Sequence, residues 1–404
     1  MTEGFRWHPG ARLFDSAGTE VRASAAASSQ GAAARGAAGV ILPDTPQGLA
    51  AAIGHPAFRI GAPDQPPPDP HDQPILETLT AGSTGQPRRI RRTQASWIAS
   101  FAVNAGLCIR PDARIATLGR LIHSLSLYGA IEGLHLGAQV HLLSELRPDR
   151  QRAAMRDRRI THLYATPAQL RLVLGPGMLP DLGLILVGGS KLDSSLRAAL
   201  AILAPNAQVH EFYGAAETSF ITLADKATPH TSVGRPFPGV EIHLDPIGEV
   251  WVKSPYLFLG YADPPRTTAG LRRGGPPATR WQDGWLSVGE IGGMQDGLLY
   301  LKGRAGRMIT VADQNVFPEE IEAFLHSLPG ISRAAVLPIP DAKRGHALIA
   351  FLQGDPAQEA AIVTALRQTL GPLKSPKALL WRDDWPMLPS GKTDLKALEA
   401  AWPA

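Results

Sequence analysis

Short apolar runs alternate with amphipathic, helix-like stretches along the chain from Ile75 onward. Apolar runs of about four to eight residues between turn signals are typical of buried strands, and strands that alternate with helices favour α/β layers with largely parallel sheets. We predict strands at 114–118, 139–143, 162–164, 184–187 and 209–212.

The chain before Ile75 has weaker periodicity. Residues 40–42 read as a short strand, and 45–53 as a helix that begins at a Thr45 cap with Pro46 in its first turn. Residues 23–39 are rich in Ala, Ser and Gly, and 62–74 contain six prolines. We expect neither of these segments to be a core element, and we interpret the second as a linker.

The pattern changes to β-rich segments with Gly and Pro turns after about Val233, and to a compact α+β tail at the end. These segments are 239–244, 249–253 and 298–301, then 318–328, 334–338, 348–352 and 361–370. We therefore predict an α/β protein with a large N-terminal domain, 1–302, of layered α/β subdomains plus a small β-rich part. A mobile C-terminal α+β lid domain, 303–404, follows it.

Composition is that of an ordinary globular protein with room for a sizeable core. The 404 residues are 44% hydrophobic and 19% charged, with a net charge of +4. The arginines of 88–92 suggest a nucleic-acid binder, but aromatic residues are only 6% and do not interleave with them. We interpret the cluster as solvated faces, or as positive potential around an anionic cofactor.

The cysteine count and the N-terminus point to a cytoplasmic protein. Cys108 is the only cysteine, so disulfide frameworks and cysteine zinc sites are excluded within a monomer, and its apolar context predicts a buried thiol. MTEGFRWHPG has no signal-peptide pattern, and no apolar stretch approaches the roughly 20 residues of a membrane span. We expect no stable membrane insertion.

A small-residue loop, TAGSTGQPRR at 80–89, is the most informative motif. Glycines permit close approach, so such a loop can aim backbone N–H groups and hydroxyls at a polyphosphate, although similar loops are also exposed linkers. It lacks the Walker and GxGxxG spacings. The candidate phosphate-binding residues are Thr80, Gly82, Ser83, Thr84, Gly85 and Arg88.

The loop resembles the phosphate loop of the adenylate-forming superfamily, and further segments match that family's pattern in the same order over roughly 76–398. They are LVGGS at 186–190, EFYGAAE at 211–217, GRPFPG at 234–239, GWLSVGEIG at 284–292, KGRAGRMI at 302–309, NVFPEEIE at 315–322 and PSGK at 389–392. A common order of this kind is not expected by chance.

The resemblance implies a role for each matched position. Tyr213 would stack on adenine, Glu217 would hold Mg²⁺, and Glu290 would bind the ribose hydroxyls. Arg304 would contact ribose or phosphate, and Lys392 would bridge the substrate carboxylate and phosphate. The resemblance also places Gly188, Gly189, Ser190, Gly214 and Ala215 against the nucleotide or the acyl group. The implied cofactors are ATP, which yields AMP, Mg²⁺, and the thiol of CoA or phosphopantetheine.

Five positions depart from the family pattern. Arg88 replaces a lysine, Ala216 a threonine, Glu290 an aspartate, Gly306 the hinge Asp or Lys, and Asp313 a lid-loop glycine. Most charge is retained, while Ala216 removes a hydroxyl donor, so we expect an active enzyme of modest rate. The part before the phosphate loop is shorter than the family usually has.

His123 is the main substrate clue. It lies where the resemblance implies a gating histidine in acyl- and aryl-acid ligases and an amine-pairing aspartate in amino-acid activators. An ammonium group would stay desolvated and unpaired there, which argues against an amino acid. His123 can equally be a core histidine bonded to the backbone.

We therefore predict an AMP-forming ligase that activates a fatty or aromatic acid and passes it to CoA or to a carrier protein in trans. Asp313 adds bulk to the lid loop, and its negative charge would repel the phosphates of CoA, so a carrier protein is favoured as the acceptor. Two other classes stay open: a catalytically degenerate nucleotide-binding or scaffolding member of the same fold, and an arginine-rich nucleic-acid binder.

Overall fold

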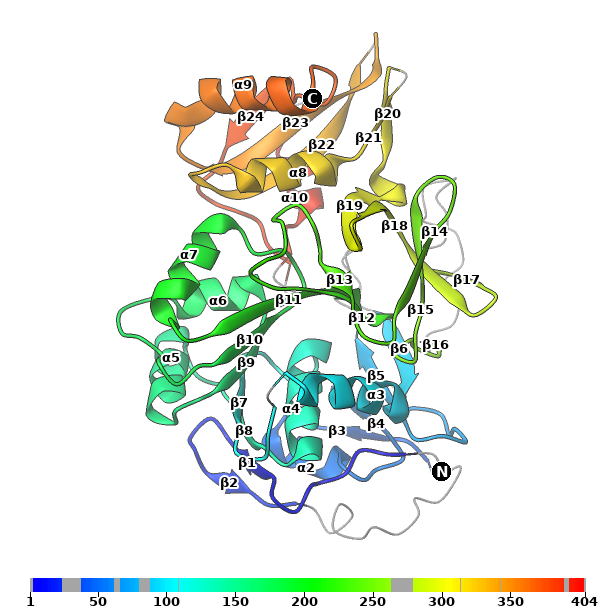
Figure 1. The fold of residues 1–404 in the computed structure, drawn as a ribbon, viewed down its shortest axis with the longest axis vertical. Helices are drawn as coiled ribbons and strands as arrows, with labels where there is room; N and C mark the ends of the chain where they lie inside the picture. The colour runs from blue at the N-terminus through cyan, green and yellow to red at the C-terminus, as the bar shows by residue number, and fades with distance from the viewer. Residues whose placement is uncertain are drawn as a thin grey trace.

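The computed structural model in Figure 1 describes most of the chain. The described residues are 3–23, 38–61, 66–79, 88–107, 109–262, 279–312, 314–341, 343–388 and 392–402. The α/β layers and the β-rich part of the prediction form the body, and the α+β tail forms a small unit above it in the view of Figure 1.

A nine-stranded sheet forms the centre of the body. Its strands are β1 (Arg12–Phe14), β2 (Glu20–Val21), β7 (Arg114–Thr117), β8 (Gln139–Leu142), β9 (His162–Ala165), β10 (Leu184–Val187), β11 (Gln208–Ala215), β12 (Ser219–Ala224) and β13 (Arg235–Pro236). Their order is β13-β12-β11-β10-β9-β7-β8-β1-β2. The six strands from β11 to β1 are parallel, whereas β12, β13 and β2 are antiparallel edges.

Helices cover both faces of this sheet. One face carries α5 (Pro148–Asp157), α6 (Pro167–Val173) and α7 (Ser194–Leu203), whose apolar side chains pack on β7, β9 and β10. The opposite face carries α4 (Ser124–Leu136), with α3 (Gln94–Ala105) beyond it. Side-chain caps start several helices: the hydroxyl of Thr166 accepts from the N–H of Gln169, and the Gln169 side chain accepts from the N–H of Thr166.

A second, five-stranded sheet packs on the same side as α3 and α4. Its order is β16 (Gly260–Tyr261), β6 (Arg89–Thr93), β5 (Ile75–Leu79), β4 (Ala57–Ile60) and β3 (Val40–Leu42). The helix α2 (Pro46–Ala52) connects β3 to β4 and begins at the predicted Thr45 cap. The loop between β5 and β6 is the predicted phosphate loop.

The arginine-rich strand β6 corrects one sequence-based expectation. Glu77 on β5 pairs opposite Arg91, is 1% exposed, and forms ion pairs with Arg59 at 3.2 Å and Arg91 at 2.9 Å. Arg92 lies on the other face of the strand and is also 1% exposed. The solvated-face interpretation is therefore wrong for these arginines, because strand alternation turns them toward a buried acid on one face and toward the core on the other.

The β-rich part forms a third, antiparallel sheet. It contains β14 (Glu241–Leu244), β15 (Glu249–Lys253), β17 (Arg280–Gln282), β18 (Trp285–Gln295) and β19 (Leu298–Arg304). The register of the β18–β19 pair places Glu290 directly opposite Arg304. This sheet therefore brings together two of the predicted nucleotide contacts.

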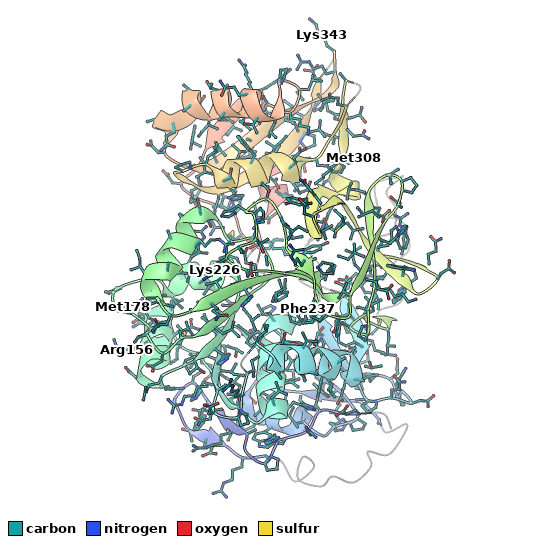
Figure 2. All side chains as sticks on the ribbon, in the orientation of Figure 1. Arg156, Met178, Lys226, Phe237, Met308 and Lys343 are labelled. Atoms are coloured by element: carbon teal, nitrogen blue, oxygen red, sulfur yellow. The ribbon has the colours of Figure 1, made fainter. Side chains whose placement is uncertain are left out.

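The C-terminal unit follows β19 and has its own apolar core, which is built from residues 309–402. It contains η1 (Ala305–Arg307), β20 (Ile309–Val311), β21 (Gln314–Val316), α8 (Pro318–Ser327), β22 (Ile331–Asp341), β23 (Gly345–Gly354), η2 (Pro356–Gln358), α9 (Glu359–Leu370), β24 (Ala378–Trp381) and α10 (Leu395–Ala400). Figure 2 shows Met308 where this unit meets the body, and Lys343 at its far tip. The predicted division at 302/303 falls in β19 and stays a prediction.

Candidate functional site

Lys392 of the C-terminal unit lies within electrostatic range of charged residues of the body. Burial lowers the pKa of Lys392, the nearby guanidinium of Arg304 lowers it further, and the carboxylates of Glu217 and Glu290 raise it. These four residues come from four separate motifs, and the sequence assigned all of them to one site. The structure brings them within electrostatic range of one another.

Glu290 and Arg304 form a cross-strand ion pair at the end of the third sheet. Arg304 Nε donates to Glu290 Oε1 at 2.9 Å, and Glu290 is 8% exposed. Tyr213, on β11, lies near both charges, and burial raises the pKa of its hydroxyl. Within the described residues this buried hydroxyl has no hydrogen-bond partner. A polar ligand beside Glu290 would satisfy it.

Glu217 follows β11 and is held on both its backbone and its side chain. Its carbonyl accepts a hydrogen bond from the N–H of Phe258 at 2.8 Å, and its Oε1 accepts one from the hydroxyl of Tyr261 at 2.7 Å. The Tyr261 ring in turn lies 3.2 Å from the guanidinium carbon of Arg88. The expected metal acid and the expected phosphate cation therefore contact one tyrosine.

Arg92 supports the turn that carries Glu217. Its Nη2 donates to the carbonyl of Ala216 and its Nη1 to that of Tyr256, and it lies near the Glu217 carboxylate. Burial lowers the pKa of Arg92 to about 10, so the group is a cation at neutral pH. Its charge lies beside the position where Ala216 replaces the family's threonine.

Small residues shape the wall next to Tyr213. Gly188 and Gly189 follow β10, and Gly189 has a left-handed φ of +95°. A side chain at Gly188 would collide with the ring of Phe212. Ser190, the next residue, is exposed, while Gly214 and Ala215 continue β11 from Tyr213. The absence of a side chain at Gly188 thus lets β10 and the Phe212 ring pack closely, and the contacts of these residues with a nucleotide stay a prediction.

His123 lies at the N-terminus of α4 and is exposed, so the structure does not support the alternative of a core histidine. It forms a parallel bridge with Leu79, the residue that directly precedes the phosphate loop. Deeper along α4, Glu132 is fully buried and accepts from Asn104, Tyr128 and Tyr164. Burial raises the pKa of Glu132 to about 7.

The expected hinge is close to the first turn of α8. Gly303 has φ +147°, and a Cβ there would lie 2.6 Å from Glu319. Arg307 pairs with Glu319 at 3.2 Å and with Glu322 at 2.9 Å. The chain thus leaves β19 through a glycine-dependent bend that is tied to the C-terminal unit.

Several predicted residues lie outside the described part of the chain. They are Thr80, Gly82, Ser83, Thr84 and Gly85 of the phosphate loop, Cys108, Asp313, and the first three residues of PSGK. Their expected roles stay predictions.

The described residues fit a nucleotide better than a protein-only metal site. Among them, no group of three or more His, Cys, Asp and Glu side chains is placed to hold a metal. A cation at Glu217 would therefore need further oxygen ligands, which a polyphosphate supplies. The orphaned hydroxyl of Tyr213 fits a bound nucleotide.

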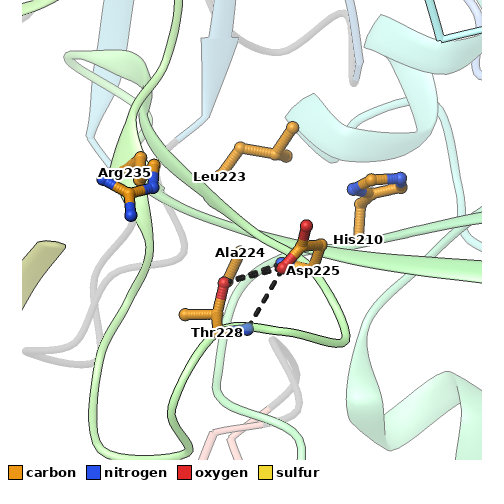
Figure 3. Close-up of a pocket in the computed structure, with 6 residues that line it drawn as sticks. All are labelled: His210, Leu223, Ala224, Asp225, Thr228 and Arg235. Atoms are coloured by element: carbon orange, nitrogen blue, oxygen red, sulfur yellow. Dashed lines mark hydrogen bonds between the residues drawn. The ribbon is translucent and has the colours of Figure 1, made fainter. Parts of the chain in front are cut away.

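A small pocket of about 110 Å³ lies along β11 and β12 (Figure 3). It is lined by His210, Leu223, Ala224, Asp225, Thr228 and Arg235. Asp225 accepts from the N–H and hydroxyl of Thr228, and Arg235 donates to the carbonyl of Asp296. The Asp225 bonds close a local turn, and the Arg235 bond ties β13 to the turn at Asp296, so structural hydrogen bonds account for these polar groups.

Tyr261 and Arg92 are the residues of this site that sequence reasoning missed. Tyr261 reaches Glu217 across 44 residues, and Arg92 reaches Ala216 across 124. The second interpretation of the arginine cluster, as positive potential around an anionic cofactor, did point toward a role for Arg92. No sequence pattern pointed to Tyr261, because its place in the site depends on the pairing of β16 with β6.

Comparison with known proteins agrees with this geometry. Residues 14–262 match the family model for AMP-binding enzyme, and residues 320–392 match that for the AMP-binding enzyme C-terminal domain. The acyl–CoA ligase YhfT of Bacillus subtilis (strain 168), which is described as uncharacterized, is 32% identical over 338 residues, covering 80% of this chain and 67% of the relative. The fatty acid–[acyl-carrier-protein] ligase ScoC of Streptomyces coeruleorubidus is 27% identical over 364 residues, with the same two coverages.

Among solved structures, the amide bond synthetase McbA from Marinactinospora thermotolerans is similar with a TM-score of 0.69 and 26% identity. The match covers 86% of this chain and 76% of McbA. The fold is thus that of an adenylate-forming enzyme. The chain belongs to the AMP-binding enzyme family, within the superfamily that its motifs resemble. It spans about two thirds of the length of YhfT and ScoC.

Within the described residues, no helix is long and apolar enough to cross a membrane.

Proposed function

We propose that this chain activates a non-amino carboxylic acid, fatty or aromatic, with ATP. The acid forms an acyl-adenylate as pyrophosphate leaves, and the acyl group then passes to a thiol of CoA or of a carrier protein in trans as AMP leaves. The observation that carries the proposal is that Lys392 is partly buried within electrostatic range of Glu217, Glu290 and Arg304. A lysine that reaches from the C-terminal unit into the acidic site can neutralise charge as a carboxylate attacks the α-phosphate.

Each residue has a proposed role in that step. Glu217 would hold Mg²⁺, which would neutralise phosphate charge, and Glu290 would accept from the ribose hydroxyls. Tyr213 would stack on adenine, while Arg88, together with Thr80, Gly82, Ser83, Thr84 and Gly85, would hold the phosphates. Gly188, Gly189 and Ser190 would lie against adenine and the acyl group. We further propose that 303–404 turns as a lid about Gly303–Gly306, which removes Lys392 before the thiol attacks.

The acid class follows from His123 and from relatives. A neutral or cationic imidazole offers an ammonium no counter-charge, so an α-amino acid would be poorly bound. YhfT is named as an acyl–CoA ligase and ScoC as a fatty acid–[acyl-carrier-protein] ligase. McbA is named as an amide bond synthetase, so an amine belongs among the acceptors to be tested. We also propose a cytoplasmic location.

ATP–pyrophosphate exchange over a panel of fatty, aromatic and amino acids tests the activation step. We expect exchange with at least one fatty or aromatic acid and none with free α-amino acids. Strong exchange with an α-amino acid alone would reject the acid class. The absence of exchange with every acid, together with retained ATP binding, would favour the degenerate nucleotide-binding alternative.

A release assay with CoA, holo carrier protein or an amine then identifies the acceptor. Asp313→Gly tests the preference for a carrier. We expect the wild type to load the carrier more efficiently, and the glycine variant to gain on CoA. Efficient CoA loading by the wild type that the glycine does not improve would contradict this preference.

A further inference from the structure

Tyr261 lies where three parts of the site meet. It ends β16, which pairs antiparallel with β6 so that Tyr261 is opposite Ile90. The N–H of Ala262 donates to the carbonyl of Arg89 at 3.0 Å, which fixes the register next to Arg88. The ring position therefore follows from backbone pairing with the strand that leaves the phosphate loop.

The hydroxyl and the ring of Tyr261 each contact a charged residue. The hydroxyl donates to Glu217 Oε1 at 2.7 Å, and the face of the ring lies 3.2 Å from the guanidinium carbon of Arg88. The ring of Phe258 packs edge-on against that of Tyr261, with the ring centroids 5.2 Å apart. The backbone N–H of Phe258 donates to the carbonyl of Glu217. Phe258 thus connects the ring of Tyr261 to the turn that carries Glu217.

This geometry suits positioning better than direct chemistry. A hydroxyl donor orients a carboxylate without cancelling its charge, so the carboxylate can still bind a cation. A ring face fixes the plane of a guanidinium that stacks on it. One side chain therefore sets where an acid and a cation stand relative to each other.

We propose that Tyr261 is a positioning residue that couples Glu217 to Arg88. It holds the proposed metal acid and the proposed phosphate cation at a fixed separation. This inference rests on the proposed function of the site, and it adds a residue that neither the motifs nor the family resemblance assigned.

Binding of Mn²⁺ in the presence of ATP, followed by electron paramagnetic resonance, tests the coupling without any acid substrate. Tyr261→Phe loses the hydroxyl and keeps the ring, so Mn²⁺ should bind roughly tenfold more weakly, the scale of one hydrogen bond to a charged group. The Kd for ATP at saturating Mg²⁺ should stay unchanged. Tyr261→Leu loses both contacts and should raise that Kd as well.

Two further measurements separate positioning from a general structural role. In a Glu217→Gln background, Tyr261→Phe should have no additional effect on Mn²⁺ binding, because the hydroxyl acts through that carboxylate. Tyr300→Phe, at a half-buried tyrosine on β19, serves as the matched control and should behave as the wild type. Melting temperatures verify that the variants are folded.

Wild-type Mn²⁺ binding by Tyr261→Phe would overturn the proposal, as would a full additional loss in the Glu217→Gln background. Equal Kd values for ATP in Tyr261→Leu and Tyr261→Phe would remove the link to Arg88 and overturn the coupling. A wild type that binds Mn²⁺ and ATP but exchanges no pyrophosphate contradicts the proposed function instead, and the binding results still decide the role of Tyr261.

Discussion

The two acidic side chains that raise the pKa of Lys392 are held by different kinds of hydrogen-bond partner. Glu290 pairs with the guanidinium of Arg304 at 2.9 Å, directly across two strands, whereas Glu217 accepts from the neutral hydroxyl of Tyr261 at 2.7 Å. A carboxylate that is paired with a cation has much of its charge compensated, and one that is held by a hydroxyl keeps its charge.

The difference separates two tasks within one site. The acid with a neutral partner suits a metal ion, which requires negative oxygen. The acid with a cationic partner suits hydrogen bonding to neutral ribose hydroxyls, and its arginine lies next to the bend into the C-terminal unit. The predictions below change the partners or the acids one at a time.

Glu217→Gln should have the largest effect. Without a negative oxygen the metal is held poorly, so adenylation should lose about 3 kcal/mol of transition-state stabilisation, or roughly 100-fold in rate. Pyrophosphate exchange measured over a Mg²⁺ titration would show it, with Glu241→Gln, an exposed glutamate on β14, as control. An active Glu217→Gln variant with an unchanged Mg²⁺ titration would reject the assignment.

A third acid, Glu132, extends the comparison to stability. It is fully buried among neutral donors, and burial raises its pKa to about 7. Because the folded-state pKa is raised, its contribution is present at low pH and is lost as pH rises toward 7, by about 3 kcal/mol. Glu132→Gln cannot titrate, so urea unfolding should depend less on pH in this range. Parallel pH curves for the variant and the wild type would contradict the prediction.

Glu290→Gln should cost less than Glu217→Gln. The charge-assisted bond to Arg304 is lost but an amide oxygen still accepts, so we expect about 1 kcal/mol, seen as a roughly fivefold rise in the KM for ATP. Arg304→Gln should show a similar rise, and the double variant should not be additive. Additive effects would mean that the two side chains act separately.

The smallest effect concerns the pH profile of adenylation. Lys392 acts as a cation, so the rate should fall as pH rises through its lowered pKa. Glu290→Gln removes a charge that raises this pKa and should move the alkaline limb to lower pH, while Arg304→Gln should move it to higher pH. If the alkaline limb moved in the same direction in both variants, the charges of this ion pair would not control the pKa of Lys392.

Much of the fold could be predicted because its strands are apolar and regularly spaced. The strands β7, β9 and β10 and the helix α2 with its Thr45 cap agree with the predictions. The edge strands β1 and β2 could not be found, since runs of three and two residues carry no periodicity. They are held by pairing with β8 and with each other, which only the tertiary fold supplies.

The site shows the same limit. Glu217, Glu290 and Lys392 could be proposed because each belongs to a contiguous motif with a recognisable order. Tyr261 and Arg92 depend on contacts between strands far apart in the chain, and such contacts leave no local pattern. The buried state of Arg92 also depends on which face of β6 meets the core, and an arginine-rich run does not reveal that from composition.

The central claim is that Lys392 serves the first half-reaction from the position the structure gives it. Single-turnover rates of Lys392→Ala for adenylate formation and for thioester formation from supplied acyl-adenylate test this claim, with Lys396→Ala, an exposed lysine on α10, as control. We predict a loss of about 2–4 kcal/mol in adenylation and a near wild-type rate of thioester formation. Adenylation by Lys392→Ala at the wild-type rate would contradict the account.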